Sequence, residues 1–296
     1  MIGLYKTVYE CEVITPMFLR GGDNKTCDIR PPAIKGAMRF WFRALIGNIP
    51  ENKIRTMEKI LFGGINGEGS QTGQRSPFSI HVKIPGEKIE TISVSPTPHK
   101  GPKGERDAVK PGVVFTVELF VLNNKTVWAN GGELSNEKIL EIIGCIFEQT
   151  AIFGGLGMRS RRGFGAFKIT KKNGKVFSMN QVLQTFEEAK DSTKGNHQTA
   201  YEEHWVGKKK FDNPFDLVCF VGAKSHEIRK KYGNGCNNSL GTGGEHRLAS
   251  PVIVSAIPVT GSEKLRLIMT CICSQETSRG IQIQDEFMDM LDGKRY

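Results

Sequence analysis

The segment with the most chemical potential is the glycine- and arginine-rich stretch 154–165. It holds five glycines in twelve residues, and Arg159, Arg161 and Arg162 stand among them. Glycines let a backbone approach a ligand closely and expose its N–H groups. Arginine forks match the oxygens of a phosphate and also stack on bases. The pattern therefore favours RNA binding, with a flexible, solvated turn as the alternative interpretation.

A second basic segment, 30–43, has helical spacing. Lys35, Arg39 and Arg43 are four residues apart, so they form one cationic stripe, while Trp41 belongs to the apolar stripe on the other side. Two prolines suit the first turn of this helix. Because no Ser, Thr, Asp or Asn caps that turn, its backbone donors stay available to a phosphate. The alternative is a solvated basic face.

Catalytic groups are sparse around these two segments. Metal-free RNA cleavage needs a histidine close to the scissile phosphate, and His246, which flanks a later glycine-rich loop, is the candidate. Asp23 and Asp28 offer carboxylates for a metal, although the cations around them favour a salt-bridged loop. Cys271 and Cys273 are too close together for a zinc knuckle. A metal-dependent or histidine-dependent endoribonuclease is therefore the alternative function, and no catalytic or metal-binding residue is assigned.

Composition and charge narrow the class of protein. The formal net charge is +10, which favours an anionic partner. The N-terminus lacks the apolar core of a signal peptide, and no stretch has the roughly 20 apolar residues of a membrane span. We therefore expect a cytoplasmic protein without a membrane partner, with its seven cysteines reduced. No Walker or dinucleotide-binding glycine pattern occurs, so no cofactor is expected.

The periodicity of the first half predicts a complete α+β unit. Alternation predicts strands, and helical spacing predicts helices, in this order: strand 5–14, helix 31–47, helix 52–61, strand 80–84, strand 115–121, a helix capped by Ser135, and strand 165–170. Apart from the short second helix, this is the strand and helix order of the ferredoxin-like, split βαβ arrangement. The connection 85–112 is unusually long, and its part 96–112 is rich in proline, lysine and arginine, a composition that predicts a functional or mobile segment without packing against the core.

A polar run at 171–175 predicts a boundary between a domain 1–175, which carries the glycine-rich loop, and a domain 176–296. The elements predicted in the second domain are helix 178–190, strand 216–222, a basic helix 225–232, a loop 233–244, a hairpin of 252–258 with 264–273, and an acidic helix 283–292. These elements do not complete a ferredoxin-like order. The acidic helix also favours a protein-bridging role, which is compatible with RNA binding by the first domain.

Three segments of the chain resemble a known family. Residues 30–43 and 153–165 closely resemble two signature segments of the RAMP superfamily of CRISPR-associated proteins, and 247–253 is similar to its C-terminal hallmark. Within the superfamily, the resemblance is to the subunit numbered one of the Cmr-type (type III-B) RNA-silencing complex. The stretch 173–215 matches no pattern of the family.

The resemblance implies a non-catalytic, RNA-binding subunit with two ferredoxin-like domains. Its implied partners are the guide RNA near the 3′ region, the target RNA and the other subunits of the complex. The residues that we expect to contact RNA are Arg30, Lys35, Arg39, Arg43, Gly157, Arg159, Arg161, Arg162 and Phe164.

Overall fold

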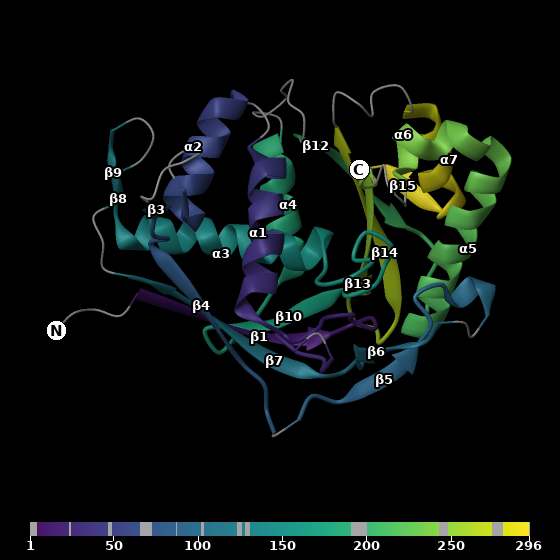
Figure 1. Ribbon diagram of the computed structural model, residues 1–296, viewed down its shortest axis with the longest axis horizontal. Coiled ribbons are helices and arrows are strands. Elements are labelled where there is room, and N and C mark those ends of the chain that lie inside the picture. The colour runs from purple at the N-terminus through teal and green to yellow at the C-terminus, as the bar shows by residue number, and fades with distance from the viewer. Residues whose placement is uncertain are drawn as a thin grey trace.

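Two antiparallel sheets with helices between and beside them make up the protein (Figure 1), here as a computed structural model. The structure describes residues 5–23, 25–46, 49–65, 73–86, 88–101, 104–122, 126–127, 131–190, 200–242, 248–273 and 281–295. In these ranges, every helix is too short or too polar to cross a bilayer.

The first sheet has the predicted ferredoxin-like order. Its strands are β1 (Tyr5–Val13), β4 (Phe78–Lys83), β7 (Val114–Val121), β10 (Phe167–Lys172) and the short β11 (Lys175–Val176). The order across the sheet is β11-β10-β1-β7-β4, with β1 in the middle between β10 and β7. Helices α1 (Pro31–Leu45), α2 (Glu51–Phe62) and α3 (Asn136–Phe153) connect the strands. Ser135 caps α3 as predicted, since its hydroxyl accepts a hydrogen bond from the Lys138 backbone N–H at 3.2 Å.

The second sheet repeats this arrangement. Its elements are β12 (Ala200–Gly207), α5 (Pro214–Tyr232), β13 (Val252–Pro258), β14 (Leu265–Cys273), α7 (Ile281–Met290) and β15 (Gly293–Arg295). The strands lie in the order β13-β14-β12-β15, so the first strand is again between the fourth and the third. The second ferredoxin-like fold that the resemblance implied is therefore present, completed by β12 and β15, which the periodicity did not predict.

The predicted strand 216–222 is wrong, because these residues form the first half of the single helix α5. Asn213 caps this helix by accepting a hydrogen bond from the Phe215 backbone N–H at 2.8 Å, and a proline occupies its first turn. Leu217, Val221 and Ile228 are buried at helical spacing. A short apolar run does not separate a buried strand from a buried helix face, and the cap decides between them.

The expectation that residues 96–112 do not pack is also wrong. Strands β5 (Thr91–Val94) and β6 (Arg106–Val109) form a hairpin whose tip includes the short helix η1 (Pro98–Lys100). Ala108 and Val109 are fully buried, and Val109 exchanges backbone hydrogen bonds with Met17 at 2.9 and 3.1 Å. Two apolar residues at the end of β6 thus hold a segment that is otherwise polar against the body of the protein.

The two sheets are packed through the helices of the first. Buried isoleucines of β13 and β14 share one apolar cluster with α1, α3 and the first sheet. Helix α4 (Met179–Lys190) packs against the same cluster. The remaining elements are β2 (Gly64–Ile65), β3 (Gly73–Gln74), β8 (Thr126–Val127), β9 (Glu133–Leu134), η2 (Gly233–Gly235) and α6 (Cys236–Leu240). A domain boundary at 175/176 stays a prediction.

Candidate nucleic-acid interface

The basic stripe of α1 faces α2. The apolar side of α1 buries Trp41 on the core, as predicted, so the cations point the other way. Arg43 donates to the Glu58 carboxylate at 2.8 Å, and the Arg39 Nε lies 3.7 Å from the same carboxylate. Arg39 also donates to the backbone oxygens of Phe62, at 3.2 Å, and Gly63. The stripe is therefore not simply a solvated face, because Arg39 and Arg43 fasten the end of α2 to α1.

The start of α1 is different. Lys35 lies 4.7 Å from the centre of the Phe78 ring, and no carboxylate pairs with it in the part of the chain that the structure describes. Burial lowers the pKa of Lys35, and the neighbouring Arg39 lowers it further. Arg30 precedes the first turn, which has neither a side-chain cap nor an acidic residue, and its Nε is buried without an acceptor. Positive charge and backbone donors are thus available together at this end of the helix.

The glycine-rich loop is a fixed structure. Gly157 and Gly165 have φ angles of 85° and 70°, and a Cβ at either would overlap a backbone oxygen. The loop is bonded to the segment that follows β1, because Met158 N donates to Phe18 O and Gly165 N donates to Pro16 O, both at 3.0 Å. The flexible, solvated turn is therefore wrong as an interpretation of this loop.

Two arginines of the loop hold the second sheet. Arg161 donates to the backbone oxygen of Ser250 and lies 4.7 Å from the centre of the Phe40 ring on α1. Arg162 donates to Ser250 Oγ at 3.0 Å, to Val252 O at 3.1 Å and to Leu240 O at 2.9 Å. All three segments that carry the family resemblance therefore meet here, although almost 90 residues separate Arg162 from Ser250.

The two other side chains of the loop that were predicted to contact RNA, Phe164 and Arg159, have contrasting surroundings. Phe164 is 2% exposed, and its ring lies 5.1 Å from that of Phe18, so it supports the loop and offers no surface for stacking on a base. Arg159 has a φ of 61°, which is rare for a residue with a side chain. Its Nε is buried and has no acceptor. Burial lowers the pKa of Arg159, and Arg229 of α5 lowers it further.

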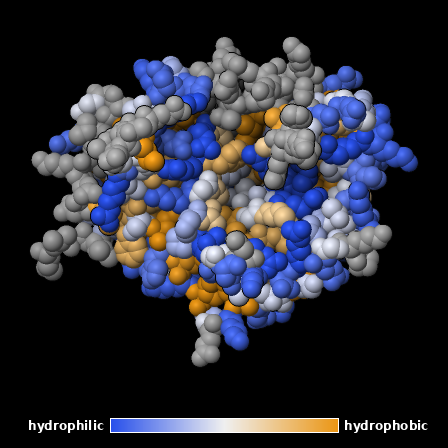
Figure 2. Space-filling view, viewed as in Figure 1, coloured by the Kyte–Doolittle hydropathy of each residue, from blue (hydrophilic) through white to orange (hydrophobic). Residues whose placement is uncertain are grey.

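Sequence reasoning did not predict that basic side chains of other elements lie beside the glycine-rich loop. Arg106 of β6 reaches the Met158 sulfur at 3.8 Å, and His99 of η1 lies 5.8 Å, between ring centres, from His226 of α5. In the view of Figure 2, hydrophilic residues gather over α1 and α2 on one side and over α5 on the other. The spacing of residues in the sequence did not indicate that His99 and His226 lie together, because more than 100 residues separate them.

The candidate catalytic groups have structural surroundings. Asp23 accepts hydrogen bonds from the backbone N–H groups of Lys25 and Thr26, at 2.9 and 3.0 Å, and these bonds lower its pKa. Asp28 lines an open groove beside Asp107. Among the described residues, no three His, Cys, Asp or Glu side chains are grouped so as to hold a metal ion. His246 lies outside the described residues.

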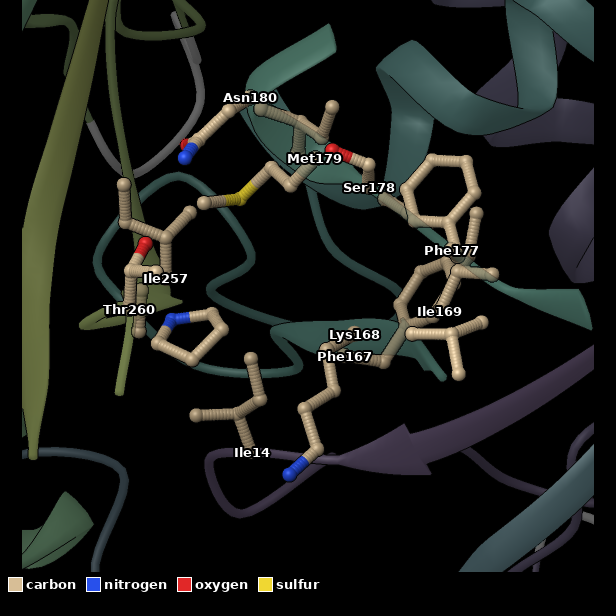
Figure 3. A pocket seen from close by; sticks show the side chains of 15 residues that line it. Ile14, Phe167, Lys168, Ile169, Phe177, Ser178, Met179, Asn180, Ile257 and Thr260 are labelled. Carbon is tan, nitrogen blue, oxygen red and sulfur yellow. The ribbon is translucent and has the colours of Figure 1, made fainter. Parts of the chain in front are cut away.

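A separate apolar cavity of about 310 Å³ lies between β10, α4 and the end of β13 (Figure 3). Ile14, Ile169, Met179 and Ile257 are among its lining side chains, and the one cation at its edge, Lys168, is paired with Glu12 at 2.9 Å. The lining lacks the free positive charge that an RNA backbone requires. This cavity is not part of the candidate interface.

Known proteins of similar sequence come from Pyrococcus furiosus. The CRISPR system Cmr subunit Cmr1-2 is 24% identical over 184 residues, which cover 56% of this chain and 96% of that protein. The subunit Cmr1-1 is 28% identical over 178 residues, which cover 56% of this chain and 49% of that protein.

Solved structures share the fold over nearly the whole length. The apo crystal structure of Cmr1 from Pyrococcus furiosus has a TM-score of 0.58 and 18% identity, and covers 92% of this chain and 88% of that one. A chain of the cryo-EM structure of the type III-B Cmr-beta bound to cognate target RNA has a TM-score of 0.62 and 11% identity. The match covers 97% of this chain and 99% of that one. The sequence model of the RAMP superfamily matches residues 10–168, more than half of the chain. The chain therefore belongs to the RAMP superfamily.

Proposed function

We propose that this chain is a non-catalytic, RNA-binding subunit of a type III-B CRISPR effector complex in the cytoplasm. One observation carries the proposal: the start of α1 and the glycine-rich loop present cations that no described carboxylate neutralises, on a chain of the RAMP fold. A structural neighbour of the same fold belongs to a Cmr-beta complex bound to target RNA, which supports RNA as the ligand. The proposed partners are the guide RNA near its 3′ region, the target RNA and other subunits of that complex.

The proposed contacts divide by what each side chain already does. The direct phosphate contacts are three cations that no described carboxylate neutralises: Lys35, Arg30 and Arg159. In the two arginines, the buried Nε also has no hydrogen-bond acceptor. Gly157 brings the backbone of the loop to the surface, where it is exposed. The other predicted residues act mainly by holding these contacts in place, and they are Arg39, Arg43, Arg161, Arg162 and Phe164.

The same side chains explain why the proposal includes no catalysis. Transfer of the 2′-hydroxyl proton needs a group that accepts a proton near neutral pH. The side chains at the proposed interface are mostly lysine and arginine, which stabilise negative charge and do not accept a proton. Asp23 already accepts hydrogen bonds that close its own turn. The endoribonuclease therefore receives no specific support from the described residues.

The test is crosslinking in the assembled complex. Guide and target RNAs carry 4-thiouridine at single positions, and the crosslinked peptides are identified by mass spectrometry. We expect peptides from 30–43 and 154–165, with the 3′ region of the guide or the facing part of the target. Crosslinks confined to other surfaces, such as the acidic helix α7, would contradict the proposed interface. Affinity that does not change between 50 and 200 mM salt would contradict phosphate binding.

A further inference from the structure

Helix α5 presents a stripe of three residues toward the hairpin tip and the glycine-rich loop. Gly222, His226 and Arg229 are spaced by four and three residues, so they share one face of α5. The His99 imidazole of η1 lies directly over Gly222, where a Cβ would overlap its Nδ1. The rings of His99 and His226 are 5.8 Å apart, tilted by 37°. The absent side chain of Gly222 therefore lets two imidazoles meet on this face.

The glycine-rich loop closes the other side of this group. Arg229 donates to the backbone oxygens of Leu240, at 2.7 Å, and Gly241, at 2.9 Å, and Arg162 donates to the same Leu240 oxygen at 2.9 Å. Arg159 is close enough to these groups that Arg229 lowers its pKa, and Arg159 in turn lowers the pKa of His99. The hairpin tip, α5 and the loop thus bring their basic side chains to one place.

This basic group has no compensating acid among the described residues. The acidic neighbour on α5, Glu227, is paired with Lys224 at 2.8 Å. The Arg159 Nε and the His99 Nδ1 are both buried without a hydrogen-bond partner. Such atoms are rare in folded proteins, and buried cations without a counter-charge are costly. An anion beside these side chains supplies the missing counter-charge, and because Nδ1 of His99 lies against Gly222, the His99 nitrogen that donates to it is Nε2.

We propose that His99, His226 and Arg159 form a binding site for one phosphodiester of the RNA backbone, at the junction of η1, α5 and the glycine-rich loop. The choice of RNA as the source of that phosphate rests on the proposed function. A phosphodiester carries a full negative charge and two non-bridging acceptor oxygens, which match a guanidinium fork and the imidazole N–H donors. The exposed side chain of His226 gives the ligand access from solvent.

Binding at this site takes up protons. Burial lowers the pKa of His99 first, and His226, Lys100 and Arg159 lower it further. The charged or titratable groups that act on His99 are thus Lys100 on its own element, His226 on α5 and Arg159 on the loop, all of them basic. A bound phosphodiester reverses this repulsion and raises the pKa of His99. The affinity for RNA therefore increases as the pH falls, by at most about tenfold per pH unit for each proton taken up.

The test is fluorescence anisotropy of the full chain with a labelled 12-nucleotide single-stranded RNA, from pH 5.5 to 8.0 at constant ionic strength. We expect binding at pH 5.5 to be at least about fivefold tighter than at pH 8.0. His99→Gln, and Gly222→Ala, which displaces the His99 ring, should each lose most of this gain. His81→Gln is the matched control, because His81 pairs with Glu118 on the first sheet, and it should keep the gain.

Two results separate this site from the function it rests on. An equal gain in His99→Gln and the unsubstituted protein would overturn the site while RNA binding stands, whereas no RNA binding at any pH would contradict the proposed function itself. Imidazole NMR spectra identify the source of the phosphate. RNA should shift the His226 signals, and shifts with inorganic phosphate but none with RNA would assign the site to a free anion and overturn the proposal.

Discussion

Replacing Arg159 with Gln should reduce the salt dependence of RNA binding by the amount expected for one phosphate contact. Its guanidinium has a buried Nε without an acceptor, and no described carboxylate pairs with it. Each phosphate contact to a single strand contributes about 0.7 to the slope of log affinity against log salt concentration. From 50 to 200 mM salt, the variant's affinity should therefore fall about 2.6-fold less than that of the unsubstituted protein.

Arg43→Gln is the matched control, since it removes the same charge from the surface. Arg43 already donates to Glu58 at 2.8 Å, so its charge is neutralised within the protein. We expect the salt slope of this variant to stay within about 0.2 of the unsubstituted value. Thermal unfolding of both variants checks that the fold is intact.

Fluorescence anisotropy with a labelled single-stranded RNA, at six or more salt concentrations, gives the slopes. Equal reductions in Arg159→Gln and Arg43→Gln would refute the reasoning, because net charge alone would then explain the affinity. An unchanged slope in Arg159→Gln would remove Arg159 from the interface.

Three further predictions concern stability and catalysis. The pKa of Glu118 is lowered, chiefly because Lys83 donates to its carboxylate at 2.9 Å. The stabilisation from this carboxylate is therefore complete above its unfolded-state pKa and is lost as the pH falls through its folded-state pKa. Glu118→Gln should flatten the acid side of a plot of unfolding free energy, measured in urea, against pH. Gly157→Ala should destabilise the fold by about 2 kcal/mol or more in urea denaturation, whereas Gly36→Ala, in an open helix position, should stabilise it by roughly 0.5–1 kcal/mol. Asp23→Ala should leave target cutting by the assembled complex intact, measured with labelled RNA; lost cutting in a complex that still assembles would restore the nuclease alternative.

The parts of the fold that the sequence predicts correctly have strong local signals. Helices α1 and α3 carry an apolar stripe and either a proline start or the Ser135 cap, and both match their predicted ranges within two residues at the start. The strands of the first sheet alternate clearly, so the ferredoxin-like order follows from them. In α5, by contrast, a run of apolar residues outweighed the Asn213 cap and the proline beside it.

Elements that depend on distant partners could not be predicted in this way. Strand β12 pairs with β14 and β15, more than 60 residues further along the chain, and its sequence has no clean alternation. The hairpin of β5 and β6 is polar and becomes ordered through Met17 and the buried Val109. In both cases the decisive contacts are tertiary, which outweigh local propensity.

The candidate interface shows the same division at the level of single side chains. Composition correctly placed positive charge on two segments, but it did not separate the arginines with partners from those without. Glu58 neutralises Arg43 from a different helix, and Ser250, which lies just before β13, binds Arg161 and Arg162. A cation's availability is thus a property of the tertiary structure, and it is invisible in the spacing of the cations.

The arginines that hold the loop also order it in advance for the proposed ligand. Arg161 and Arg162 fix the loop between α1 and β13, and Arg159 keeps a left-handed backbone within that frame. A loop that is already ordered does not lose conformational entropy when RNA binds, so more of the phosphate interaction contributes to affinity. The segments that resemble the RAMP signatures therefore contribute in two ways. Some of their cations are the proposed RNA contacts, and the others join the two sheets so that the first group stays in position.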